Sequence, residues 1–306
     1  MSEAVNLNTL ICYPEAGICE VPEIKTNVSD KKVSQGNKPV HILYYTDPIC
    51  SACWGIEPQL RKLNLEYGEY YEIEYKMGGL LPSWDCEHES KIGNPADLAH
   101  HWEEVGDYYG MPIDGDVWLE DPLSSSYPPS IAFKAAQLQD DAKSLLFFRR
   151  MKEMLFLEKI NIAKWKWIEK AAQETGLDTE LLKNDVEGDA QRLFQEDLDI
   201  SKHMGVRGFP TLFFSNAEGN QMILYGVRPY KDFEQVLQKV CPQAVKQPIT
   251  ETHEGLFNHY TTLTTREFAV ITDRNDNEAL EILNSLFKLK YIDKYLSKKG
   301  TLWIKK

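Results

Sequence analysis

The sequence lacks long apolar runs and is poor in positive charge, and each absence excludes a class of protein. No stretch approaches the roughly 18 consecutive apolar residues of a membrane-spanning helix, so we expect no transmembrane segment. Lys and Arg number 34 against 47 Asp and Glu, a formal net charge of −13, which disfavours nucleic-acid binding by the molecule as a whole. Internal repeats and low-complexity tracts are absent as well.

The N-terminus also lacks a secretory signal. Its first residues, MSEAVNLNTLICYPEAGICEVPE, contain neither a basic n-region nor an apolar h-region before the acidic residues. We therefore expect a cytoplasmic protein. In that reducing compartment a framework of structural disulfides is not expected, and a C-x-x-C pair more often binds metal or performs redox chemistry.

What the sequence does contain is an alternation of strand and helix patterns, which predicts an α/β fold. PVHILYYT (39–46) predicts a buried strand, residues 54–67 a helix and YYEIEYKM (70–77) a second strand. Between about 97 and 206 apolar residues recur at helical spacing, which predicts an all-helical block. A hairpin and a final helix follow within 211–240. This is the element order of a thioredoxin-like fold with an all-helical insertion.

The composition divides the chain into three parts. Residues 1–38 are polar and predict an irregular lead-in, and residues 39–245 form the thioredoxin-like domain. Residues 246–306 predict a small C-terminal α/β module, in which two helices precede two short strands around Lys-Gly, an order that resembles a winged helix. This module is slightly basic, with ten Lys and Arg against eight Asp and Glu.

Cys50 and Cys53, in DPICSACWGIEP, are the strongest candidates for chemistry. They lie where the first predicted strand gives way to a helix. The helix dipole and the unpaired N–H groups of its first turn favour a thiolate at Cys50, and the thiolate is the nucleophile. Cys53 lies one turn further on and could close the disulfide that resolves a mixed intermediate. Pro58 is expected to kink the helix.

The segment GVRGFPTLFF supplies the second half of the predicted site. X–Pro bonds adopt the cis form far more readily than other peptide bonds, and Pro210 begins a predicted strand, so it is a candidate cis-proline. In a thioredoxin architecture this loop faces the dithiol, and the backbone of Phe209 is free to pair with an extended substrate. The predicted substrate-binding residues are Phe209, Gly208, Trp54, Ser51 and Ala52.

Two other interpretations of the C-x-x-C pair stay open. A zinc site would need a second ligand pair at compact spacing, whereas the other cysteines are scattered and the adjacent His100 and His101 cannot face one ion from a helix. A buried, inert pair is the second alternative. No Gly-rich phosphate loop accompanies the aromatic residues of the helical block. We therefore predict no metal and no cofactor.

Cys12 and Cys19 form a second possible pair. The six residues between them include Pro and Gly, which predicts a loop that could bring the two sulfurs together. An auxiliary dithiol that relays electrons to the main pair is one interpretation, and metal capture or unpaired thiols are the others. Cys86 and Cys241 are interpreted as incidental.

In combination, the motifs DPICSACWGIEP, KMGGLLPSW, HHWEEVGDYYG and DISKHMGVRGFPTLFF resemble the DsbA-like thioredoxin superfamily, above all the cytoplasmic FrnE-like proteins described as dithiol–disulfide isomerases. The resemblance covers about residues 39–241. It implies that Cys50 is the nucleophile, Cys53 the resolving thiol and Pro210 the cis-proline. Pro58 matches the proline that thioredoxins carry five residues past the second cysteine.

One departure from the family pattern bears on the direction of the chemistry. The family's usual dipeptide between the cysteines ends in Trp, and DsbA carries a His there, whereas this chain has Ser51-Ala52, neither of which stabilises a thiolate. The resemblance therefore implies a thiol–disulfide oxidoreductase poised as a reductase or isomerase, acting on a protein disulfide or a low-molecular-weight thiol.

A related YjbH/SpxH-like branch of the superfamily implies a second class of function. Its members act as adaptors that deliver a transcription regulator to a protease, and the module at 246–306 would then bind a protein partner. Kappa-class glutathione transferases share the core and suggest a third hypothesis. They typically present a single Ser in place of the cysteine pair, so the intact dithiol of this chain disfavours the transferase hypothesis.

Overall fold

The computed structural model describes residues 38–83, 95–250 and 252–306, together with the backbone of residues 12–13 and 18–20. At its centre is a four-stranded sheet, in which β3 is parallel to β4 and antiparallel to β6, and β6 is antiparallel to β7. The strands, in order across the sheet, are β4 (Tyr71–Met77), β3 (Val40–Thr46), β6 (Thr211–Asn216) and β7 (Gln221–Tyr225).

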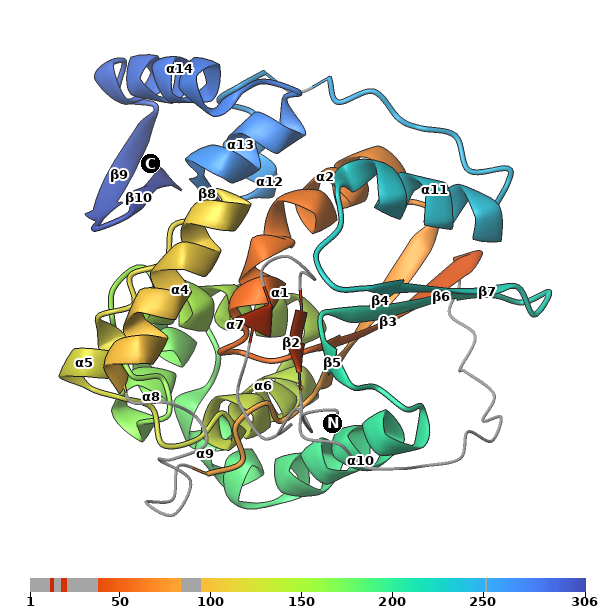
Figure 1. The fold of residues 1–306 in the computed structure, drawn as a ribbon, viewed down its shortest axis with the longest axis vertical. Coiled ribbons are helices and arrows are strands. Elements are labelled where there is room, and N and C mark those ends of the chain that lie inside the picture. The colour runs from red at the N-terminus through yellow and green to blue at the C-terminus, as the bar shows by residue number, and fades with distance from the viewer. Residues whose placement is uncertain (1–11, 14–17, 21–37, 84–94, 251) are drawn as a thin grey trace, which may run out of the picture.

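Helices cover both faces of this sheet, which explains why every residue of the central strand β3 except His41 is buried (Figure 1). On one face, α2 (Glu57–Tyr67) and α11 (Tyr230–Val240) enclose one apolar core. The predicted helical block encloses a larger core on the other face. Its helices are α4 (Pro95–Tyr109), α5 (Val117–Glu120), α6 (Tyr127–Gln139), α7 (Asp141–Phe156), α8 (Trp165–Glu174), α9 (Thr179–Glu187) and α10 (Asp189–His203). The predicted thioredoxin-like fold with a helical insertion is confirmed.

The C-terminal module has its own sheet and its own core. Its elements are α12 (Leu256–His259), β8 (Thr262–Thr264), α13 (Thr265–Ile271), α14 (Asp276–Lys288), β9 (Ile292–Ser297) and β10 (Gly300–Lys305). The strand β10 lies between β8 and β9, and apolar side chains such as Phe268, Leu283 and Trp303 fill the space between sheet and helices. This is the order of elements in a winged helix, an assignment that stays a prediction.

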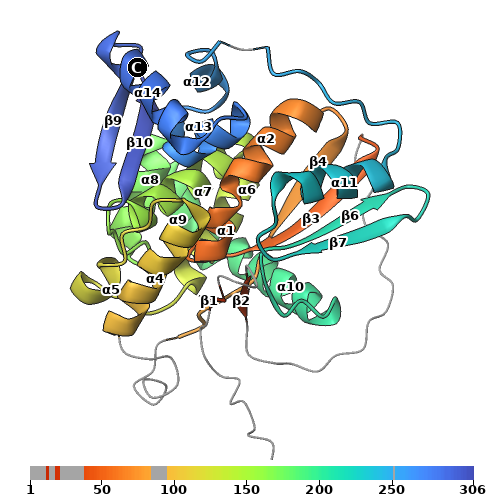
Figure 2. The same ribbon diagram turned by 45° about the horizontal axis from the view of Figure 1, so that its top comes forward.

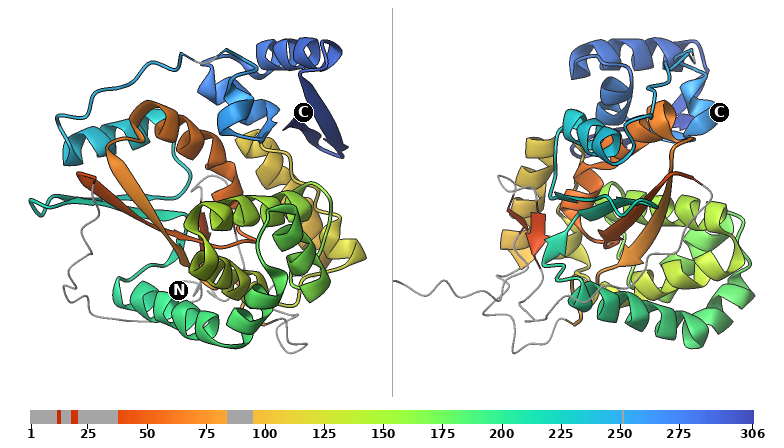
Figure 3. Two further views of the ribbon diagram at one scale, coloured as in Figure 1. Left: turned by 180° about the vertical axis from the view of Figure 1, so that it is seen from behind. Right: turned by 90° about the vertical axis from the view of Figure 1, so that its right-hand side faces the viewer.

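The module packs against the thioredoxin-like domain beside α2 and α4 (Figures 2 and 3). The ammonium group of Lys62, on α2, contacts Asp273 and donates to the carbonyl of Val270 at 3.0 Å. On the other side of the module, Lys299 lies 3.0 Å from Asp107 of α4. None of the helices in the described ranges is long and apolar enough to cross a membrane.

Two short strands lie in the segment for which the sequence predicted an irregular lead-in. β1 (Cys12–Tyr13) pairs with β2 (Ile18–Glu20), and β2 pairs in turn with β5 (Gly208–Phe209). Such short strands are defined by their partners in space, which explains why the local sequence did not indicate them. Apart from Lys38, the rest of the predicted lead-in lies outside the described residues, as does Cys86.

Candidate functional site

The predicted dithiol lies at the end of β3, where a short turn leads into α1 (Ser51–Gly55). Cys50 is the N-cap residue of α1, and its Sγ accepts a hydrogen bond from the backbone N–H of Cys53 at 3.2 Å. The S–H of Cys50 points toward the carbonyl oxygen of Phe209, 3.8 Å away. The helix breaks at Ile56 before α2 begins, with a proline in the first turn of α2.

The loop opposite the dithiol is the predicted proline loop. The Phe209–Pro210 peptide bond is cis, as predicted. The ring of Phe209 packs against the backbone of Gly78, where a Cβ atom would lie 1.8 Å from the ring. Only glycine fits at that position, so Gly78, the first residue of the GGLLPSW stretch, allows the ring of the proline loop's Phe209 to pack directly against the backbone.

Asp47, which the sequence reasoning passed over, ties these segments together. Its fully buried carboxylate accepts hydrogen bonds from the N–H of Ile49 at 3.0 Å, the N–H of Leu80 at 2.8 Å and the hydroxyl of Ser126 at 2.9 Å. Burial raises the pKa of Asp47 to about 6. An acidic residue just before the C-x-x-C pair was visible in the sequence, but its partners come from distant segments.

Burial dominates the protonation of the two thiols, both of which are fully buried. Burial, the interaction with Cys53 and the negative charge of Asp47 raise the pKa of Cys50. Burial also acts to raise the pKa of Cys53, but the hydrogen bond from Cys50 and the positive charge of Lys152 lower it on balance. With both thiols buried, Cys53 therefore has the lower pKa, whereas the sequence predicted the lower pKa for Cys50. Cys50 as the attacking sulfur stays a prediction.

Trp54, a predicted substrate contact, is enclosed by the protein. Its indole N–H donates to the carbonyl of Pro112 at 3.1 Å, its ring stacks on Phe156 with centroids 5.4 Å apart, and the guanidinium group of Arg149 lies 4.4 Å from its ring centroid. In this conformation it offers no surface to a substrate, and that role stays a prediction. Buried as well are the other predicted contacts, Ser51, Ala52, Gly208 and Phe209.

The strand β2 accounts for part of this enclosure. The Cα of Cys19 is in register with Phe209, and that of Glu20 with Gly208, so the chain's own N-terminal segment occupies the edge that an extended substrate was predicted to use. The β1–β2 register also pairs the Cα of Cys12 with that of Cys19. The backbone of the predicted auxiliary pair, Cys12 and Cys19, thus lies next to the proline loop.

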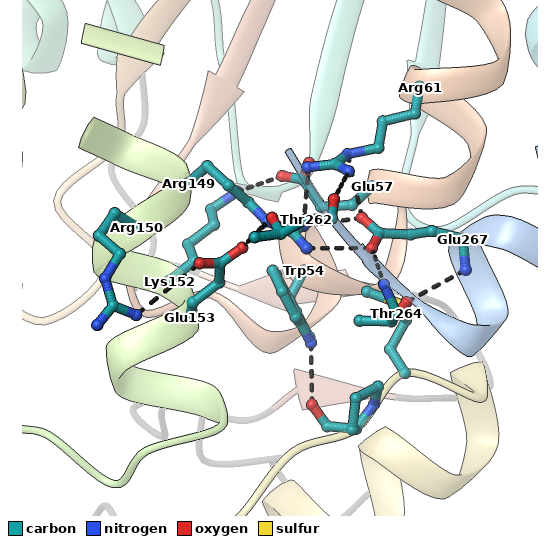
Figure 4. A network of polar contacts seen from close by, with 12 residues as sticks. Trp54, Glu57, Arg61, Arg149, Arg150, Lys152, Glu153, Thr262, Thr264 and Glu267 are labelled. Carbon is teal, nitrogen blue, oxygen red and sulfur yellow. Dashed lines mark hydrogen bonds and ion pairs between the residues drawn. The ribbon is translucent and has the colours of Figure 1, made fainter. Parts of the chain in front are cut away.

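A cluster of charged side chains surrounds Lys152, close to Trp54 of α1 (Figure 4). Lys152 is fully buried on α7, and its Nζ lies 2.8 Å from Glu57. Burial opposes ionisation of Glu57, but the charges of Lys152, Arg149 and Arg61 lower its pKa on balance. The sequence reasoning missed these residues because a charged residue on a predicted helix is usually solvent-exposed.

The described residues contain one cluster of carboxylates close enough to share a cation. The carboxylates of Glu103, Asp114 and Asp116 offer oxygens within 4.8 Å of one another. The ammonium group of Lys298 contacts Glu103 and lies 2.9 Å from Asp116. This cluster is therefore an ion-paired contact between the helical block and the C-terminal module.

Comparison with known proteins agrees with this architecture. A family model described as thioredoxin matches residues 43–235. The cytosolic disulfide reductase DsbM from Pseudomonas aeruginosa has a similar fold, with a TM-score of 0.53 and 20% identity over 66% of this chain and 100% of that one. The fold and the dithiol opposite a cis-proline thus define a thioredoxin-type protein with a DsbA-like helical insertion.

The full-length similarity is more specific. The ClpXP adapter protein SpxH of Halalkalibacterium halodurans is 34% identical over 301 residues, which cover 97% of each chain. The protein of the same name from Bacillus subtilis is 31% identical over 271 residues, which cover 87% of this chain and 89% of that one. The chain therefore belongs to the thioredoxin family and, within it, to the group of SpxH proteins. The sequence had placed this branch further away than the FrnE-like proteins.

Proposed function

We propose that this chain is an adaptor that brings a client protein to a ClpXP-type protease. The observation that carries the proposal is its similarity to relatives of that name, which extends over 97% of the chain and so includes the C-terminal module. The disulfide reductase, by contrast, matches 66% of the chain. The sequence favoured an oxidoreductase first and an adaptor second, and the names of the relatives favour the second. A cytoplasmic location stays a prediction.

The edge beside the cis-proline is the proposed client contact. The pairing of β2 with β5 supports this proposal, because it places an extended strand of the chain itself at that edge. Main-chain hydrogen bonds at a sheet edge supply affinity, while side-chain pockets supply selectivity. A client segment would bind by taking the place of β2. The buried dithiol behind this edge suits a binding site better than a site of rapid turnover.

The adaptor proposal is tested with purified components. Immobilised chain is presented with ClpXP from Bacillus subtilis, and with the disulfide reductase DsbM as a fold-matched control in place of the chain. We expect saturable binding of ClpXP to the chain and none to the control. Equal, non-saturable retention on both surfaces would contradict the proposal.

A redox-active dithiol is the second candidate function, carried by the position of Cys50 at a helix N-terminus opposite the cis-Pro210 loop. The Cys50 thiolate would attack one sulfur of a substrate disulfide and release the other as a thiolate. The Cys53 thiolate would then attack Cys50, forming the Cys50–Cys53 disulfide and releasing the substrate with two electrons gained. Insulin reduction by the wild type and by Cys50→Ser tests it, and equal rates would end this candidate.

We propose that Cys12 and Cys19 form an auxiliary dithiol that exchanges electrons with the Cys50/Cys53 pair. Directly opposed residues of antiparallel strands have Cα atoms about 4.5–5.5 Å apart, within the range that a disulfide spans. A Cys12–Cys19 disulfide would exchange with the Cys50/Cys53 dithiol, so that two electrons pass from one pair to the other. Peptide mapping of the oxidised protein tests this exchange, and a Cys12–Cys19 disulfide that persists beside reduced Cys50 and Cys53 would contradict it.

A further inference from the structure

The C-terminal module inserts a fully buried carboxylate into the charge network beside the dithiol helix (Figure 4). Glu267, on α13, contacts Arg149 through both oxygens, at 2.8 and 3.0 Å. Arg61, on α2, lies 3.2 Å from the same carboxylate. Glu267 also accepts from the N–H of Thr264 at 2.6 Å, as the third residue of a capping box. One carboxylate thus caps its own helix and joins two cations of the other domain.

Arg149 connects this carboxylate to the redox helix. Its guanidinium group lies over the ring of Trp54, the residue that follows Cys53 in α1. The same guanidinium group lies 2.7 Å from Glu153 and 3.9 Å from Glu57. Glu57 is in turn the partner of Lys152, one of the charges that lower the pKa of Cys53. The module is therefore linked, through Arg149 and Glu57, to the lysine whose charge lowers the pKa of Cys53.

The buried network is balanced in charge. Its three cations face three carboxylates: Arg61, Arg149 and Lys152, against Glu57, Glu153 and Glu267. Arg150, at the edge, lies 3.8 Å from Glu153 and is itself paired with two further carboxylates, those of Glu158 and Glu174. Because buried charges are weakly screened, the loss of one member leaves an excess of the opposite sign next to α1.

We propose that Glu267 is a positioning residue through which the C-terminal module sets the reduction potential of the Cys50–Cys53 pair. Without its negative charge, the excess of positive charge stabilises a thiolate and with it the reduced pair, so the pair becomes a stronger oxidant. The inference rests on the proposed reversible disulfide and adds its regulation. A partner that moves α13 would change the potential of a dithiol that it does not touch.

Equilibration of the protein with glutathione redox buffers tests this inference in Glu267→Gln. Glutamine keeps the capping-box side chain but lacks the charge. We expect the equilibrium to move about tenfold toward the reduced pair, a potential about 30 mV less negative. The matched control is Glu278→Gln. Glu278 holds the same position in the capping box of α14 but is exposed and outside the network, so we expect no shift.

Two further variants keep the test informative if Glu267→Gln does not fold, since it leaves a buried arginine short of a partner. Arg61→Gln removes a cation instead and should move the equilibrium in the opposite direction. The double variant Arg61→Gln/Glu267→Gln restores neutrality and should return the wild-type value. Equilibrium constants that agree within about twofold in all folded variants would overturn the proposal.

Failure of the redox function is distinguishable from failure of this inference. If the wild type forms no Cys50–Cys53 disulfide at any glutathione ratio, the redox candidate fails. The thiolate pKa of the reduced protein, followed by ultraviolet absorbance, then tests the charge coupling by itself. We expect a lower thiolate pKa in Glu267→Gln than in the wild type and in Glu278→Gln, and three equal values would overturn the inference.

Discussion

At the scale of single residues, the dithiol loop is held in place by Asp47, a buried acid for which the sequence predicted no role in the chemistry. Asp47 holds the turn before Cys50, the stretch after β4 and the start of α6 together. Three donors converge on its carboxylate, yet burial still raises its pKa. The residue that orders the dithiol loop therefore costs stability when it is ionised.

This cost predicts a pH dependence of stability. The pKa of Asp47 rises from 3.8 to about 6, so the folded state binds this proton more tightly than the unfolded chain. The stabilisation is complete below about pH 4 and is lost as the pH rises through about 6, a change of about 3 kcal/mol. We expect urea denaturation to show this decrease in the wild type and not in Asp47→Asn.

The matched control for this prediction is Asp140→Asn. Asp140 is an exposed N-cap residue of α7, and asparagine caps a helix about as well as aspartate does. The control should keep the wild-type dependence on pH between about 4 and 6.5. A slope in Asp47→Asn as steep as that of the wild type would show that another group is responsible.

At the scale of secondary-structure elements, we expect strand β2 to control the access of a client or a reagent to the dithiol. It contacts α1 and pairs with β5, so it lies between solvent and the edge beside the cis-proline. A pairing of only two residues is easily displaced, because short strands contribute few hydrogen bonds. We therefore expect a client segment to be able to displace β2 from the edge of β5.

A proline in β2 tests this view. Glu20→Pro removes a backbone donor from the strand, whereas Glu20→Ala keeps it. We expect iodoacetamide to label Cys50 about tenfold faster in Glu20→Pro than in Glu20→Ala, because local opening then costs less. The readout is mass spectrometry of the labelled peptide over time. Equal labelling rates in the two variants would mean that β2 does not cover the site.

The contrast between β3 and β2 explains how much the sequence could predict. β3, the helical block and the hairpin follow from the local period of apolar residues, and Cys50, Cys53 and Pro210 follow from motifs of a few residues. The pairing of β2 with β5 and the contact of Arg149 with Glu267 join segments far apart in the chain. No local sequence pattern indicates these two contacts, and the sequence around a glutamate does not show whether its side chain is buried or exposed.

At the scale of the whole molecule, the C-terminal module and the thioredoxin-like domain share a buried, charge-balanced contact. α2, which follows the dithiol helix, is covered by the sheet core on one side and by α13 on the other. The ionic contacts of Arg61 and Lys62 fix α2 against the module. A protein bound to the module thus has a physical route to the dithiol, and one bound at the β5 edge would meet it directly.

The measurement that tests the central claim most directly is client turnover by ClpXP. A cell extract from Bacillus subtilis is depleted of its own SpxH and supplied with ATP, purified ClpXP and either this chain or buffer, and protein half-lives are measured by mass spectrometry. The account predicts that a small set of proteins decays faster only when the chain and active ClpXP are both present. Half-lives that are identical with and without the chain, for every protein in the extract, would contradict it.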